Sequence, residues 1–206
     1  MSGSKPQRLT RGQVLRRLMQ SENVLANAEV NLRRGTCDWA DGELRYRLLV
    51  WPTRPGHLAI TVFVSPAGLL GIASDQGGLD ATVGVRPMSD ADSLMASPPA
   101  LAAFVDVARR FVADRADLCW LLMQEHDVRR DDAVAWLYQG YPARLVKALV
   151  LARELGSSTL EQQVQAVLHS GRQVAVSPIE TQDVMVAAER WAVQLARQTG
   201  TTVTLD

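Results

Sequence analysis

The chain has 206 residues, enough for one or two domains that bury a core without disulfides. Its 22 Lys and Arg residues balance 22 Asp and Glu residues, which excludes a uniformly basic nucleic-acid sleeve and an acidic solvating tail. With 47% hydrophobic and 21% charged residues, it has the composition of a globular protein rather than of a disordered one.

Redox and targeting features indicate a bacterial cytoplasmic protein. Cys37 and Cys119 are the only cysteines, too few for a disulfide framework or a thiolate-rich zinc site. The first 20 residues lack the apolar stretch of a secretory signal. The uncharged stretch 55–74 is interrupted by Ser65-Pro66-Ala67-Gly68, so it predicts a hairpin rather than a membrane helix. We expect no membrane association. The abundance of Ala and the near-exclusive use of Arg over Lys indicate a GC-rich bacterial genome.

Residues 1–86 predict a helix followed by an antiparallel sheet. Thr10 and Gln13 form a capping-box pattern, and apolar residues at near-helical spacing follow as far as Gly35, with a break near Ser21. Alternating apolar residues then predict three or four strands, at 43–50, 58–64, 69–74 and 81–86. The short connections between them favour an antiparallel meander.

A linker and a helical segment follow. Residues 87–97 are rich in Ser, Asp and Pro and are expected to be a linker. Residues 98–156 predict helices packed on the sheet, the first beginning at Ser97-Pro98 and another capped by Asp131 or Asp132. The stretch 118–123 is apolar on all sides, and its periodicity fits either a buried helix or a buried strand.

The last segment, 157–206, predicts helix, strand, helix and strand in that order. Ser158 with Glu161 forms a capping box, Ser177-Pro178 begins the second helix, and 201–205 alternates as a strand. The expected fold class is therefore α+β: a helix, a three- to four-stranded antiparallel sheet, a helical segment and a C-terminal strand–helix–strand unit.

Two resemblances add to this interpretation. Residues 169–206 resemble the large polyvalent-protein-associated domain of conjugative relaxases and plasmid primases, at Gly171, Val174-Ala175-Val176, Ser177, Ala187-Ala188, Ala192, Gly200 and Val203. The family commonly has a glycine-containing turn where this chain has Ser177-Pro178. The resemblance implies a plasmid or integrating element and supplies no catalytic residue.

The second resemblance covers residues 11–112. Their order of helix, antiparallel strands and helix is similar to that of bacterial secretion chaperones and related small adaptors. Those chaperones tend to be acidic, and the neutral charge of this chain departs from them. The similarity implies an adaptor that binds another protein.

No catalytic motif is present in the sequence. There is no phosphate-binding loop ending in Gly-Lys-Ser or Gly-Lys-Thr, no dinucleotide fingerprint, no nucleophile elbow and no metalloprotease helix. Neighbouring residues of Glu125-His126-Asp127 point in different directions on a helix, so this tripeptide is expected to be a solvated helix end. We expect no catalytic residue, no metal ligand and no cofactor, although a site without a motif escapes such a search.

Basic and aromatic residues suggest a nucleic-acid surface. Residues 1–34 carry seven basic and two acidic side chains, forming an arm that either grips phosphates or is a solvated helix face. Tryptophan among arginines suits single-stranded nucleic acid, and the alternative is a tryptophan packed under an arginine stem. The candidates for nucleic-acid contact are Arg11, Arg16, Arg17, Arg45, Arg47 and Trp51. Three other tryptophans are expected in the core: Trp120, Trp136 and Trp191.

Together these features predict a non-catalytic bacterial accessory or adaptor protein that binds a protein partner and is encoded on a mobile element. The alternative is a nucleic-acid-binding accessory of conjugative DNA transfer that uses the basic N-terminal arm. An enzyme with an unrecognised site is a third hypothesis.

Overall fold

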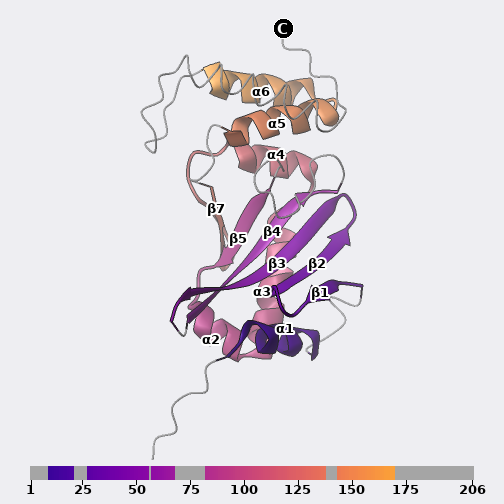
Figure 1. Ribbon diagram of the computed structural model, residues 1–206. Helices are drawn as coiled ribbons and strands as arrows, with labels where there is room; N and C mark the ends of the chain where they lie inside the picture. The colour runs from indigo at the N-terminus through magenta and orange to yellow at the C-terminus, as the bar shows by residue number, and fades with distance from the viewer. Residues whose placement is uncertain (1–8, 21–26, 56, 68–81, 138–142, 170–206) are drawn as a thin grey trace, which may run out of the picture.

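The structure, a computed structural model, describes residues 9–20, 27–55, 57–67, 82–137 and 143–169 (Figure 1). The strand expected at 69–74 and Trp191 lie outside these residues. The segment 169–206, which resembles the relaxase-associated domain, also lies outside them except for its first residue. The helices are α1 (Arg11–Gln20), α2 (Ala91–Ala96), α3 (Pro98–Phe111), α4 (Arg115–Met123), α5 (Ala143–Glu154) and α6 (Ser158–His169). The strands are β1 (Glu29–Asn31), β2 (Thr36–Asp41), β3 (Leu44–Arg54), β4 (His57–Pro66), β5 (Val83–Pro87), β6 (Val128–Arg130) and β7 (Ala133–Trp136).

The strands form one open antiparallel sheet in the order β1-β2-β3-β4-β5-β7-β6. The α+β class and the antiparallel pairing are confirmed. The expected size of three to four strands is wrong, because the described sheet has seven. Two short hairpins account for much of the difference, one at each edge of the sheet.

The first of these hairpins replaces part of a predicted helix. The expected helix begins correctly, since Gln13 N donates to Thr10 Oγ1 (3.3 Å) and Thr10 N donates to Gln13 Oε1 (2.8 Å). However, α1 ends at Gln20, and Glu29–Asn31 forms β1, paired with β2. Gly35 ends the turn between these strands with a φ of 77°, a conformation that favours glycine. A strand of three residues is too short to show alternation.

The second hairpin replaces the helix expected after Asp131 or Asp132. The turn lies between β6 and β7, and Asp131 adopts a φ of 49°, which aspartate tolerates better than most residues. β7 pairs with β5, so residues on both sides of the expected linker belong to the same sheet. The expected linker itself contains α2, whose N-cap Asp90 accepts from Ser93 N (2.8 Å).

One face of the sheet, called here the inner face, is covered by α1 and α3 (Figure 1). A line of registered residues crosses it from β2 to β7, each 0% exposed: Cys37, Leu48, Val62, Val85 and Ala135. From the helical side, α3 contributes Leu101, Phe104, Val105 and Ala108. This helix begins as predicted, with Ser97 Oγ accepting from Ala100 N (3.4 Å) and Pro98 as the first helical residue.

The three remaining helices stack at one end of the sheet, whereas α1 and α2 lie at the other end (Figure 1). The apolar stretch 118–123 belongs to α4, which decides the open choice in favour of a helix. α5 ends at Glu154, and Gly156 follows it with a φ of 64°, the conformation that favours glycine just after a helix. The serine at the start of α6 that accepts from Leu160 N is Ser157 (3.4 Å) rather than the expected Ser158. Arg153 Nε lies 2.7 Å from Glu161 Oε1 and joins α5 to α6.

Both cysteines are buried free thiols. Burial, with the Asp38 carboxylate as a smaller cause, raises the pKa of Cys37 to about 12. Burial raises the pKa of Cys119 to about 11. Both are therefore packing residues of the core. None of the described helices has the length and apolar character needed to span a membrane.

Candidate functional site

The sheet face opposite α1 and α3, called here the outer face, carries three of the six residues expected to contact nucleic acid. Arg45, Arg47 and Trp51 alternate with the buried inner residues of β3 and point to this side. Arg45 is exposed, whereas Arg47 Nε lies 2.6 Å from Asp38 Oδ1 on β2. The pattern of β3 therefore gives the outer face both arginine and aromatic character.

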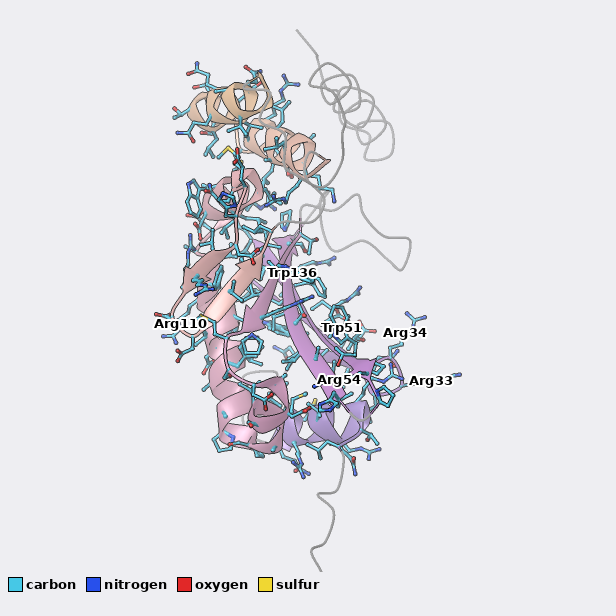
Figure 2. All side chains as sticks on the ribbon, turned by 90° about the vertical axis from the view of Figure 1, so that its left-hand side faces the viewer. Arg33, Arg34, Trp51, Arg54, Arg110 and Trp136 are labelled. Atoms are coloured by element: carbon cyan, nitrogen blue, oxygen red, sulfur yellow. The ribbon has the colours of Figure 1, made fainter. Side chains whose placement is uncertain are left out.

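Trp51 packs beside an arginine, but beside one that the sequence did not suggest. The Arg86 guanidinium lies 5.2 Å from the Trp51 ring centre and 3.6 Å from that of Trp136, and Arg86 Nε donates to Thr61 Oγ1 (3.2 Å). Trp136 was expected in a helical core, and it lies half-buried on the outer face of β7 instead. Figure 2 shows both tryptophans on the side away from α3.

The three arginines expected to form one arm diverge. Arg11 and Arg16 are exposed on α1, and Arg17 Nη1 donates to Ala96 O (3.3 Å) at the end of α2. Arg11 lines a hollow together with residues of the β1–β2 turn, and neither Arg16 nor Arg17 lines it. The helix thus directs its basic side chains to different surroundings.

A groove, called here the Trp120 groove, lies between the C-terminal end of α4, the following loop and α6. Trp120 is 39% exposed, although it was expected in the core. The groove is lined by Trp120, Met123, Gln124, Glu125, His126, Asp127, Val128, Gln163, Ala166 and Val167. Its lining combines apolar side chains with two carboxylates and contains no Arg or Lys among these described residues. Glu125-His126-Asp127 follows the helix end as expected, and it forms one wall of the groove.

Buried and partly buried hydrogen bonds hold these walls in place. Arg144 on α5 is only 5% exposed, and its guanidinium donates to Gln124 O (2.8 Å) and to Leu121 O (3.5 Å). Asp127 Oδ1 accepts from Leu137 N (2.9 Å) just after β7. The loop after α4 is therefore fixed from two directions, and the groove is formed before any partner arrives.

Arg130 on β6 lies beside Trp120, with its guanidinium carbon 5.5 Å from the ring centre. The same guanidinium binds the Asp117 carboxylate through two hydrogen bonds, of 2.6 and 2.8 Å. Burial of Asp117 raises its pKa, but hydrogen bonds from Arg130 and Ala113 N outweigh this, so that the pKa is lowered. The ionised carboxylate thus orients Arg130 beside Trp120.

No protein family, characterised protein or solved structure matches the chain. The resemblances to the relaxase-associated domain and to secretion chaperones therefore stay predictions.

Within the described part of the chain, no three or more His, Cys, Asp or Glu side chains gather in a group that could hold a metal ion. His57 Nδ1 lies 2.6 Å from Asp92 Oδ2, with side chains 41% and 45% exposed, and this contact fastens α2 to β4.

Sequence reasoning missed two sets of residues. Arg33 and Arg34 were assigned to a helix, although the turn-like sequence Asn31-Leu32-Arg33-Arg34-Gly35 is a usable signal. Trp120 gave no such signal, because it lies in the apolar stretch 118–123 and its neighbours there are buried apolar residues.

Proposed function

We propose that the protein is an adaptor that binds a protein partner in the Trp120 groove. The observation that supports this most directly is the exposed Trp120 beside Met123 and Val128 in a largely apolar, preformed groove. Tryptophan is among the residues that contribute most to protein–protein affinity, especially where a pocket surrounds it. A groove with fixed walls also binds at a smaller entropic cost than one that must be ordered.

The partner segment is an amphipathic helix with basic residues beside its apolar face. Apolar residues on both walls, Met123 and Val128 on one and Ala166 and Val167 on the other, suit an apolar helix face. Glu125 and Asp127 at the wall favour Lys or Arg on the partner. The described lining contains no Arg or Lys, which also favours a basic rather than an acidic partner segment.

The wider setting belongs to the proposal as well. The adaptor is a non-catalytic bacterial accessory protein of the cytoplasm, encoded on a mobile element. Support for this setting comes from the composition, from the lack of catalytic motifs in the sequence and from the resemblance at 169–206.

The test is co-purification from the native host with matched surface variants. Trp120→Ser removes the aromatic side chain from the groove, and Met88→Ser removes an apolar side chain that is 50% exposed elsewhere. The amount of a partner protein that co-purifies with wild type is expected to fall about tenfold or more with Trp120→Ser. It should be unchanged with Met88→Ser. Equal recovery with both variants, each shown to melt as a folded protein, contradicts the proposal.

A separate observation favours the second candidate, a nucleic-acid-binding accessory. It is the hollow lined by Arg11, Arg33 and Arg34, which lies at the α1 end of the sheet, far from the α4–α6 end that holds the Trp120 groove (Figure 1).

A further inference from the structure

The turn between β1 and β2 is a rigid platform for two exposed arginines. Arg34 N donates to Asn31 Oδ1 (3.0 Å), and Gly35 N donates to Asn31 O (2.9 Å). Val50 N on β3 donates to Gly35 O (2.8 Å), which ties the turn to the sheet. Arg33 and Arg34 are therefore held at a fixed place on the rim of the outer face (Figure 2).

Gly35 brings a third arginine to the same place. A Cβ at this position would lie 2.6 Å from Val50 O and 3.0 Å from Arg11 Cδ. Only the missing side chain lets the stem of Arg11 lie against the turn at this distance. Arg11 thereby lines one hollow with Arg33 and Arg34, although they lie 22 and 23 positions further along the chain; it is called here the arginine hollow.

The arginine hollow has the chemistry of a phosphate site. Its lining residues are Arg11, Asn31, Arg33, Arg34, Thr36 and Leu49. The three guanidinium groups, one amide and one hydroxyl all can donate to phosphate oxygens, and no carboxylate is among these described residues. A guanidinium group can donate two parallel hydrogen bonds to a phosphate, and it stays positively charged at any ordinary pH.

The hollow continues onto the outer face of β3. Leu49 lines the hollow and is the registered partner of Thr36, and Trp51 lies two residues further along the same row. In the other direction the row continues with Arg47 and the exposed Arg45. Cationic and aromatic side chains along one strand suit a chain of phosphates and bases. A folded duplex offers no exposed base faces to such a row.

We propose that the arginine hollow and the outer row of β3 bind single-stranded nucleic acid, with backbone phosphates in the hollow and bases against Leu49 and Trp51. This site is independent of the Trp120 groove and of the partner proposed there. It refines the sequence-based hypothesis of a basic arm, because Arg33 and Arg34 take the place of Arg16 and Arg17.

The test measures fluorescence anisotropy of a labelled (dT)20 strand against the full chain at 20–200 mM NaCl. Wild type is expected to bind with micromolar affinity at low salt and to weaken steeply as salt rises. The double variant Arg33→Ser/Arg34→Ser should lose at least tenfold in affinity. Its logarithmic salt slope should fall by about 1.4, because each single-strand phosphate contact contributes about 0.7.

The control is a second double variant with the same charge change, Arg16→Ser/Arg110→Ser. Both arginines are exposed and lie outside the hollow, and Figure 2 shows Arg110 on the opposite side from Arg33 and Arg34. This variant should bind (dT)20 within about twofold of wild type. Equal losses in the two variants would show attraction by net charge alone and overturn the proposal, as would a lack of binding at 20 mM NaCl.

Comparing (dT)20 with an abasic strand of equal length tests whether the site recognises nucleic acid or any polyphosphate. This comparison needs no protein variant. The abasic strand carries the same phosphates but no bases, so it should bind wild type several-fold more weakly with a similar salt slope. Equal affinity for both strands would overturn the assignment of bases to Leu49 and Trp51. Trp120→Ser should leave (dT)20 binding unchanged, so failure of this site and failure of the proposed adaptor function are distinguishable.

Discussion

Arg130 and Asp117 form a bidentate ion pair that joins the β6–β7 hairpin to the first turn of α4. Arg130 Nη1 lies 2.6 Å from Asp117 Oδ2, and Nη2 lies 2.8 Å from Oδ1. The pair connects the last hairpin of the sheet to the helix that carries Trp120. The pair thus links two elements that no local sequence pattern relates.

Asp117→Asn tests this ion pair. The variant should lose about 1–3 kcal/mol of unfolding free energy at pH 7, because it removes hydrogen bonds to a charged group. The pKa of Asp117 is lowered in the folded protein, so its ionisation stabilises the fold above the ordinary value of 3.8, and this stabilisation is lost as pH falls through the folded pKa. Urea unfolding of wild type and variant should therefore differ at pH 7, and the difference should shrink as the pH falls below 3.8. A difference that stays constant with pH would contradict this role.

Gly35→Ala is expected to be the costlier of two matched glycine substitutions. Gly35 and Gly42 both have positive φ, of 77° and 57°, so alanine is strained at either position by about 1 kcal/mol. Only at Gly35 does the new Cβ also meet backbone, at 2.6 Å from Val50 O, whereas nothing lies within 4 Å at Gly42. Thermal melts should rank Gly35→Ala clearly below Gly42→Ala. Equal melting temperatures would show that the close approach is relieved at no cost.

The two thiols are expected to be unreactive in the folded protein. The pKa of Cys37 is raised to about 12 and that of Cys119 to about 11, both by burial, so neither forms thiolate near pH 8. A chromogenic disulfide reagent should label no thiol in the native protein and both of the chain's cysteines in guanidinium chloride. Rapid labelling of the native protein would show that one of the two sites opens.

Much of the sheet could be predicted from its alternating residues. β3 could be predicted because it is long enough to show a period of two in its apolar residues, Leu44, Tyr46, Leu48 and Val50. β2 carries a weaker form of the same signal in Cys37 and Trp39, hidden by two aspartates. β1 and β6 have only three residues each, and although each pairs with the next strand along the chain, three residues are too few to show a period of two.

The binding surfaces could be predicted only in part. Alternation along the predicted strand at 43–50 separates Arg45 and Arg47 from the apolar face, and the structure places Trp51 on the same side as these arginines. The gathering of Arg11 with Arg33 and Arg34 depends on the close approach of a helix to a turn. The Trp120 groove is made from two segments, 120–128 and 163–167, and its exposed tryptophan has the same local pattern as a buried one. Such sites arise from tertiary packing alone.

Site-specific photo-crosslinking at two neighbouring positions of α6 tests the central claim most directly. Gln162 and Gln163 are both exposed, but only Gln163 lines the Trp120 groove. A photoreactive amino acid is placed at each position in the native host, and crosslinked products are compared after irradiation. We predict a discrete protein adduct from position 163, weakened by Trp120→Ser, and little from position 162. Equal adducts from both positions, or adducts from neither, would contradict a protein partner in this groove.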